Sequence, residues 1–218
     1  PMRAKPFAVG VRMEHPQEMI NISQYGADYP SFLPSAAYKV TRQTGAGRGV
    51  YSFCMCPGGY VVNASSEKGH LAVNGMSYHA RDSRNANSAM IVTVTPEDFG
   101  SDDILAGVEF QRKLERAAYE LGGGKVPVQF VRRFLSEYTD NHAWRGGALH
   151  QGTVHVCQCE KYFPGRAVQC TEEGIHGCEK LIRGFDRPDA VLSGVESRTS
   201  SPVRIMRDET FESEIRGL

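Results

Sequence analysis

The sequence lacks the features that mark several large classes of protein. Its 218 residues hold 25 Lys and Arg against 25 Asp and Glu, so no net charge draws the chain to nucleic acid or to an anionic membrane. No apolar run approaches the about 20 residues that a bilayer span requires, and residues 1–20 lack the charged-then-apolar layout of a signal peptide. We therefore expect a soluble, cytoplasmic protein with neither nucleic acid nor a membrane among its partners.

Cysteine is also scarce, and several catalytic motifs are missing. Six cysteines are too few for a disulfide scaffold in a chain of this length, so we expect reduced thiols. The sequence has no Gly-x-Ser-x-Gly elbow, no His-Glu-x-x-His pair and no Walker A loop. A glycine cluster at residues 44–49 lacks Gly-x-Gly-x-x-Gly spacing, and a predicted strand follows it where a phosphate-binding loop needs a helix. We interpret this cluster as a hairpin turn.

Strand patterns dominate both ends of the chain. Apolar residues alternate with small or polar ones along residues 7–13, which is the period of two of a half-buried strand. Further strands are predicted at residues 38–42, 50–56, 60–62, 71–73, 90–95, 190–192 and 203–206. Because most of the connections are short, we expect antiparallel pairing.

Helical periodicity occupies the middle of the chain. Asp102 or Asp103 is expected to cap a helix that ends at the glycines 122–124. Further helices are predicted at residues 127–135 and 165–183, and residues 136–156 show no clear period, which indicates a long excursion.

The expected fold class is therefore α+β. We predict a mostly antiparallel β-sheet or partial barrel formed by about residues 1–100 and 186–210, with a helical subdomain inserted at about 102–185. Residues 1–218 then form one unit with a β part (1–101 and 186–218) and a helical part (102–185).

The run Cys54-Met-Cys-Pro-Gly-Gly59 is the first candidate site. On a strand, both thiols face the same side, about 6–7 Å apart. The residues Pro57, Gly58 and Gly59 offer bare backbone to a flat ligand, which favours a reactive or ligand-binding role. Two small buried hydrophobes are the alternative. Cys157 and Cys159 repeat the spacing, so four sulfurs could also bind zinc, although structural zinc sites more often separate their cysteines by two to four residues.

Two later stretches are dense in hydrogen-bond donors. His79 and Arg81 close the run 74–82 and suit a carboxylate, a phosphate or a polar ring edge, with a solvated surface loop as the alternative. In the run 194–204, Arg198 and Arg204 flank three hydroxyl residues, a composition typical of an anion or cofactor rim. The hydroxyl residues of this run are Thr199, Ser200 and Ser201.

These stretches together resemble a family of bacterial FAD-dependent dehydrogenases of unassigned substrate, which are flavoproteins of the glutathione-reductase type. The resemblance covers most of the chain and is carried by residues 6–12 with 14–17, by 54–59 with 74–82, and by 194–205. It implies a cap domain inserted into a split nucleotide-binding fold and facing the flavin ring. The absence of a Gly-x-Gly-x-x-Gly turn, the start at Pro1 and the abrupt end at Leu218 lead us to expect a piece of a longer protein, with FAD held by the part outside this chain.

The resemblance also implies roles for individual residues. Catalytic or substrate-anchoring roles fall on Cys54, Cys56, His79, Arg81, Arg198 and Ser200. Contacts to the cofactor fall on Pro57, Gly58, Gly59, Asn74, Gly75, Met76, Ser77, Thr199 and Ser201. The expected partners are the FAD-binding domain of the same polypeptide and a small substrate, which is anionic if the arginines anchor it. The alternatives are a metal-binding cysteine module and an interaction domain without catalysis of its own.

Overall fold

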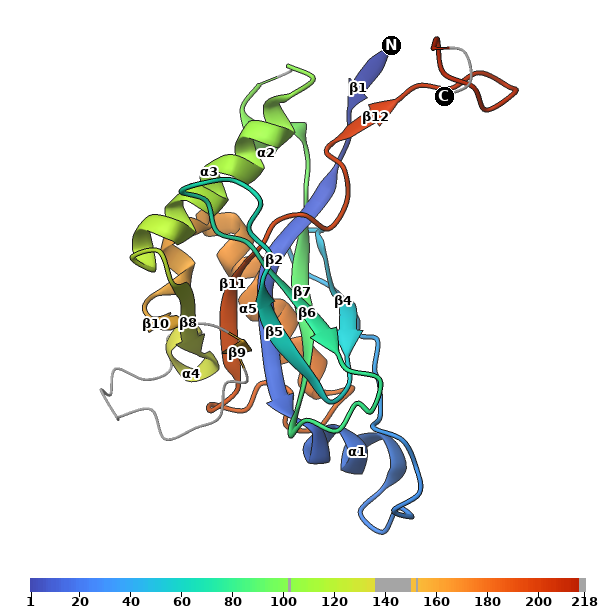
Figure 1. The fold of residues 1–218 in the computed structure, drawn as a ribbon, viewed down its shortest axis with the longest axis vertical. Helices are drawn as coiled ribbons and strands as arrows, with labels where there is room; N and C mark the ends of the chain where they lie inside the picture. The colour runs from blue at the N-terminus through green and yellow to red at the C-terminus, as the bar shows by residue number, and fades with distance from the viewer. Residues whose placement is uncertain (102, 136–149, 152, 216–218) are drawn as a thin grey trace.

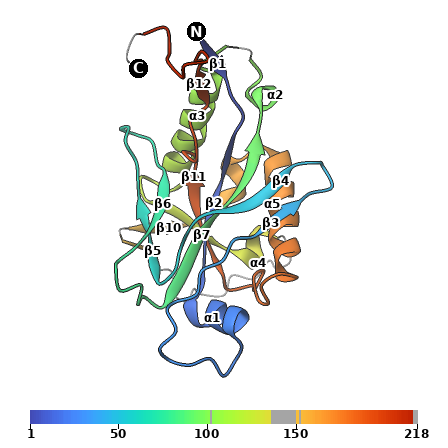
Figure 2. The same ribbon diagram turned by 90° about the vertical axis from the view of Figure 1, so that its right-hand side faces the viewer.

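The protein is an α+β structure built around one large sheet, as the sequence predicts. The computed structural model describes residues 1–101, 103–135, 150–151 and 153–215. Figures 1 and 2 show three layers: α5 (Gly165–Glu179) lies on one side of the large sheet, and β5 (Gly59–Asn63) with β6 (Val73–Ser77) lies on the other. The sheets are not closed into a barrel.

The large sheet has seven strands in the order β10-β8-β11-β2-β7-β4-β3. Its strands are β2 (Phe7–Pro16), β3 (Thr41–Gln43), β4 (Gly49–Cys56), β7 (Asn85–Val94), β8 (Val126–Phe130), β10 (Val154–Val156) and β11 (Val191–Glu196). Neighbouring strands are antiparallel except for β10 and β8, which are parallel. The central strand β2 therefore has β7 on one side and β11 on the other.

The face of this sheet under α5 carries the main core. Val11, Met13 and Met90 alternate with residues on the opposite face and pack against Ile175 of α5. Gly174 brings the helix close to the sheet, because a Cβ there would overlap the side chain of Val50. A second core joins the β5–β6 pair to α3 (Ala106–Leu121) and the 3₁₀ helix η1 (Cys159–Tyr162).

Smaller elements complete the described structure. These are α1 (Gln17–Tyr25), α2 (Pro96–Phe99), α4 (Val131–Phe134), and β9 (His150–Gln151), which pairs with β5. The strands β1 (Met2–Ala4) and β12 (Val203–Ile205) form an antiparallel ribbon at one end of the molecule, next to the N-terminus (Figure 1). No helix among the described residues has the length and apolar character needed to cross a bilayer.

Most predicted strands are found with shifted ends, although only Val73 of the strand predicted at residues 71–73 lies in a strand, β6. The predicted helices need correction. The helix expected at residues 127–135 is wrong for its first part, because residues 126–130 form β8 between β10 and β11. The segment expected to be helical thus also supplies strands to the large sheet. The helix α3 begins at Ala106 with Leu105 at its N-cap, so Asp103 does not cap it and instead accepts a hydrogen bond from the Leu105 N–H. Asp102, the other predicted cap, lies outside the described residues. The helix α5 ends at Glu179, four residues before the predicted end. Residues 136–149 of the expected excursion lie outside the described residues.

Candidate functional site

The side chain of Arg12 is fully buried on the face of the large sheet that is opposite α5. Its Nε donates to Asn87 Oδ1 at 2.9 Å, and its Nη1 donates to Glu196 Oε2 at 3.1 Å and to Asn74 Oδ1 at 3.3 Å. Its Nη2 donates to the Cys54 carbonyl and approaches Cys56 Sγ at 3.6 Å. Every nitrogen of the guanidinium therefore has an acceptor within the chain, so Arg12 organises the site and has no donor left for a ligand.

Two irregularities in neighbouring strands bring these acceptors to Arg12. The register of β4 against β7 shifts between Phe53 and Cys56, and Cys54 there has a left-handed φ of 46°. The register of β11 against β2 shifts between Ser193 and Glu196. Shifts of this kind re-aim side chains and peptide groups that regular pairing would direct elsewhere. The shift in β4 therefore directs the Cys54 carbonyl to Arg12, and the shift in β11 directs the Glu196 carboxylate to it.

The strand β6 covers the guanidinium from the other side. A Cβ at Gly75 would collide with Asn87 Oδ1 and with the Arg12 guanidinium, so only glycine fits there. The adjacent Asn74 side chain turns back to Arg12. Asn87 Nδ2 is buried without a partner among the described residues, so the cluster keeps one unused donor. The small sheet and the large sheet thus meet at Arg12.

Burial controls the ionisation of the acidic groups around Arg12. It raises the pKa of Glu196, because desolvation of the carboxylate outweighs the attraction of Arg12. It also raises the pKa of Cys56, although Arg12 acts in the opposite direction. The Cys56 thiol contacts the Cys54 side chain and lies 3.4 Å from the Cys54 carbonyl oxygen. Cys56 is therefore a protonated thiol near neutral pH, beneath the exposed Cys54.

The first two predicted stretches are brought together by β5 and β6. Gly59 pairs with Ser77 and Val61 pairs with Gly75, while Ser77 Oγ donates to the Pro57 carbonyl at 2.6 Å. Pro57, Gly58 and Gly59 are buried, and the Gly58 N–H donates to Gln17 Oε1 at 2.7 Å. These residues shape the corner and do not present free N–H groups to a ligand.

The exposed residues above Arg12 form a surface that we call the Cys54 surface. It consists of Phe53 and Cys54 on β4, and of Asn74, Met76 and Tyr78 on and after β6. His79 and Arg81 follow in the exposed turn beyond Tyr78. Phe53 is 40% exposed and Met76 is 46% exposed, so two strands present apolar side chains next to a thiol and an amide.

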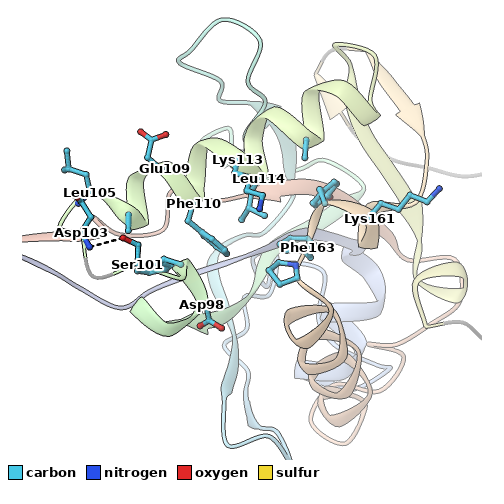
Figure 3. Close-up of a pocket in the computed structure, with 15 residues that line it drawn as sticks. Asp98, Ser101, Asp103, Leu105, Glu109, Phe110, Lys113, Leu114, Lys161 and Phe163 are labelled. Atoms are coloured by element: carbon cyan, nitrogen blue, oxygen red, sulfur yellow. Dashed lines mark hydrogen bonds between the residues drawn. The ribbon is translucent and has the colours of Figure 1, made fainter.

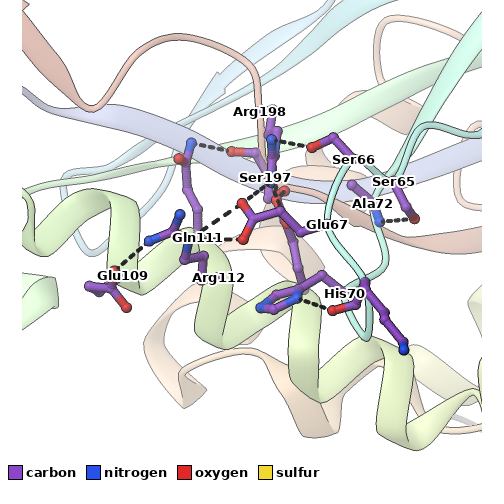
Figure 4. Close-up of polar contacts among 12 residues, drawn as sticks. Ser65, Ser66, Glu67, His70, Ala72, Glu109, Gln111, Arg112, Ser197 and Arg198 are labelled. Carbon is purple, nitrogen blue, oxygen red and sulfur yellow. Dashed lines mark hydrogen bonds and ion pairs between the residues drawn. The ribbon is translucent and has the colours of Figure 1, made fainter.

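The third predicted stretch divides at Glu196. Glu196 joins Arg12, whereas Arg198 turns to α3, where its Nε and Nη2 donate to the two oxygens of Glu115 at 2.7 and 2.8 Å. Figure 4 shows Arg198 beside Ser66 and Glu67. Arg198 also donates to Ser66 Oγ at 2.6 Å and to Glu67 Oε1 at 3.1 Å. Hydrogen bonds to Glu115 raise the pKa of Arg198. Its guanidinium is therefore occupied by carboxylates of the same chain.

The hydroxyl residues beyond Arg198 also have local roles. Thr199 Oγ1 donates to the Ala8 carbonyl at 2.7 Å, and Ser201 Oγ donates to the Val203 carbonyl at 2.7 Å. Ser200 is exposed, with Lys5 Nζ at 3.5 Å from its Oγ. None of these contacts brings residues 198–201 to the Cys54 surface.

A separate groove of about 720 Å³ runs along α3 (Figure 3). Phe99, Phe110 and Phe163 contribute aromatic rings to it, and Lys113 and Lys161 lie at its rim. None of the predicted site residues lines this groove. The four sulfurs considered for zinc are also apart, because four strands separate β10 from β4, a span of roughly 24 Å at the usual strand spacing. No group of three or more potential metal ligands occurs among the described residues.

Sequence reasoning missed Arg12, Asn87 and Glu196 as the centre of the site. Arg12 was assigned to the polar half of an alternating strand, which usually faces water. Its neighbours on the same face, Ala8 and Gly10, are small enough for another element to pack over them. Their size is the sequence signal that this face, and Arg12 with it, is buried.

Comparison with known proteins gives two matches. The family described as "FAD-dependent protein, C-terminal domain-like" matches residues 6–199. A protein of Clostridium beijerinckii (strain ATCC 51743 / NCIMB 8052), named "Uncharacterized protein", is 48% identical over 217 residues. The match covers 97% of this chain and 40% of that relative, so the chain spans less than half the length of the relative.

Proposed function

Because the chain belongs to the family of FAD-dependent protein C-terminal domain-like domains, we propose that it covers the substrate side of the flavin in an FAD-dependent oxidoreductase. The remainder of the polypeptide then holds the FAD, since this sequence has no Gly-x-Gly-x-x-Gly turn for the pyrophosphate. The Cys54 surface faces the isoalloxazine ring and leaves room for a small substrate between them.

The observation that carries this proposal is the construction of the Cys54 surface. Two strands present Phe53 and Met76 to solvent, whereas most large apolar side chains of the large sheet are buried. Cys54 on the first strand and Asn74 on the second both accept hydrogen bonds from the same buried Arg12. A guanidinium that contacts five acceptors restrains both strands, which is the rigidity that a site needs to orient a reactant.

The side chains on this surface fit a flavin ring. An isoalloxazine is flat, with a large apolar face and a polar edge, and the Cys54 surface combines apolar side chains with one thiol and one amide. When bound, FAD supplies the hydride or electron transfer. The residues of this chain then exclude water and orient the substrate, and the Cys54 thiol holds or moves a proton at its sulfur.

The charge available for an anionic substrate comes from the turn beyond β6. His79 and Arg81 are both exposed there and can approach a carboxylate or a phosphate. Arg198 is less suited to this role, because displacing Glu115 from it would leave that carboxylate buried without its bidentate partner. We therefore assign the anchoring of an anion to His79 and Arg81.

A tryptophan placed on the Cys54 surface tests the proposal. Tryptophan in contact with an isoalloxazine quenches its fluorescence, so Met76→Trp in the flavin-loaded whole polypeptide should lower the flavin fluorescence several-fold. Leu181→Trp is the matched control, because Leu181 is 49% exposed but follows α5 on the opposite side of the large sheet. That variant should leave the fluorescence unchanged.

The FAD content of both variants is measured by absorbance after unfolding. Equal fluorescence in both variants at full FAD content would contradict the proposal, and would leave an interaction domain remote from the flavin as the better description. If Met76→Trp quenches the fluorescence but an Arg81→Ala variant has unchanged kinetics, the domain faces the flavin as proposed. Only the assignment of anion anchoring to Arg81 would then be wrong.

A further inference from the structure

The second Cys-x-Cys pair lies at the other end of the large sheet and is held in place by β8. The Cys157 N–H donates to the Val128 carbonyl at 3.0 Å, and the Cys159 N–H donates to Gln129 Oε1 at 2.5 Å. Gln129 is itself buried. Both cysteine backbones are therefore fixed to adjacent residues of one strand, which holds the two Cα atoms in a defined relative position.

The two thiols lie close enough together that each one changes the pKa of the other. The backbone of Gln158 between them has φ −97° and ψ 94°, which lies between an extended strand and an inverse γ-turn. Such a bend shortens the distance between its neighbours relative to a strand. A disulfide requires Cα atoms about 4.4–6.8 Å apart, and this local geometry favours that range.

The environments of the two sulfurs differ. Cys157 is partly exposed, whereas Cys159 is completely buried and lies against the Tyr162 hydroxyl. The hydrogen bond from Cys159 lowers the pKa of Cys157, although partial burial opposes this effect. Burial raises the pKa of Cys159 well above its usual value. The accessible sulfur, that of Cys157, thus forms a thiolate more readily, and the Cys159 thiol lies beside it, buried from solvent.

We propose that Cys157 and Cys159 form a redox-active dithiol that reacts with low-molecular-weight disulfides. This assignment goes beyond the flavin-facing role of the Cys54 surface and does not depend on it. Cys157 acts as the attacking group because it is accessible, and Cys159 acts as the resolving group because it already contacts the Cys157 sulfur.

The reaction takes place in two exchange steps. The Cys157 thiolate attacks one sulfur of the external disulfide, so that a mixed disulfide forms and the other half leaves as a thiolate. Cys159 then attacks the Cys157 sulfur, the bond between Cys157 and the external group breaks, and the second external thiol leaves with the proton from Cys159. Overall, the external disulfide is reduced to two thiols while the two cysteines are oxidised to one disulfide.

The test treats the whole polypeptide with oxidised glutathione near neutral pH and maps its peptides by mass spectrometry. We expect the peptide with Cys157 and Cys159 to lose two hydrogens and to resist alkylation afterwards. A Cys159→Ser variant should retain one glutathionyl group on Cys157, whereas a Cys157→Ser variant should leave Cys159 unmodified. Circular dichroism of each variant checks that the fold is intact.

A short cysteine peptide added to the same reaction provides the standard for reagent activity. If that peptide is glutathionylated while Cys157 stays alkylatable, Cys157 is not an attacking thiol and the proposal is wrong. A stable mixed disulfide at Cys157 in the unaltered protein would show that Cys159 does not resolve it, and would also overturn the proposal. Neither result bears on the fluorescence test of the Cys54 surface, so the two proposals can fail separately.

Discussion

Arg12 and Arg198 both pair with glutamates, but they sit in opposite environments. The Arg12 side chain is 0% exposed and its partner Glu196 is 4% exposed, whereas the Arg198 side chain is 42% exposed and pairs with the buried Glu115. Arg12 joins β2 to β4, β6, β7 and β11. Arg198 joins the loop before β6 and the helix α3 to the end of β11 (Figure 4).

The two arginines have different structural roles: Arg12 organises the centre of the site, whereas Arg198 attaches a helix to the rest of the structure. The Arg12 cluster lies where the two sheets meet, directly beneath the Cys54 surface, so its loss changes the shape of that surface. The Arg198 network attaches α3 to the loop before β6 and to the end of β11, and the Arg198 side chain itself is partly exposed to water. The same residue type therefore has a structural effect that depends on how many of its partners are buried with it.

Replacing each arginine by methionine gives the largest expected contrast. Arg12→Met leaves Glu196 buried without its cation and removes the donors to Asn87, Asn74 and the Cys54 carbonyl, so we expect a loss of about 3–5 kcal/mol in the free energy of unfolding. Arg198→Met also leaves a buried carboxylate, Glu115, without its bidentate partner, but Ser197 Oγ still donates to Glu115 and Arg198 itself is 42% exposed, so we expect a smaller loss of about 1–3 kcal/mol. Urea denaturation of both variants measures the difference.

The double variant Arg12→Met with Glu196→Gln is the control for the cause of the loss. It removes the buried charge that Arg12→Met leaves behind, so it should be more stable than Arg12→Met alone. Equal losses in Arg12→Met and Arg198→Met would mean that burial does not distinguish the two networks, and would remove the basis of the comparison.

The close approach of β6 to Arg12 gives a second, smaller effect. In Gly75→Ala, the new methyl group would overlap Asn87 Oδ1 and the Arg12 guanidinium, and we expect overpacking to cost about 1–3 kcal/mol. Gly45→Ala is the matched control, since the nearest atom to its Cβ is a Glu173 carboxylate oxygen at 3.7 Å. That variant should change the free energy of unfolding little. An unchanged Gly75→Ala would show that β6 can move away from Arg12 at no cost.

Much of this fold could be predicted from local patterns, but its central cluster could not. The alternation along residues 7–13 predicts β2 because every second residue enters a core: Val11 and Met13 pack in the main core, and Phe7 and Val9 pack in the second core. The same alternation marks Arg12 as solvent-facing, and only the tertiary position of Gly75 reverses that interpretation. A buried polar cluster assembled from five strands has no local pattern, because each strand supplies a single member.

Two other predictions differ from the structure for the same reason, which is that contacts with distant segments decide the outcome. The composition of residues 198–201 indicates an anion rim, but Glu115 and Glu67, which neutralise Arg198, come from distant parts of the sequence. Val128 and Val131 are three residues apart, which suits a helix, yet Val126 and Val128 also suit a strand. Pairing of β8 with strands on both sides decides that ambiguity, and this pairing is not visible locally.

The smallest expected effect is a difference in pH dependence between the two networks. Burial raises the pKa of Glu196 above its ordinary value of 4.5, so the folded protein holds that proton more tightly than the unfolded chain. The contribution of Glu196 to stability therefore falls as the pH rises from 4.5 through the folded pKa. Glu196→Gln should remove this fall, so its stability relative to the unaltered protein should improve over that window.

Glu67 should behave in the opposite way. Burial would raise its pKa, but ion pairs with Arg112 and Arg198 lower it below 4.5. Its contribution is therefore present above pH 4.5 and is lost as the pH falls through the folded pKa. The deficit of a Glu67→Gln variant should accordingly be largest near neutral pH and should close in acid. Urea denaturation of both glutamine variants across this range gives two difference curves, and slopes of the same sign would show that Glu196 and Glu67 occupy similar electrostatic environments despite their different burial.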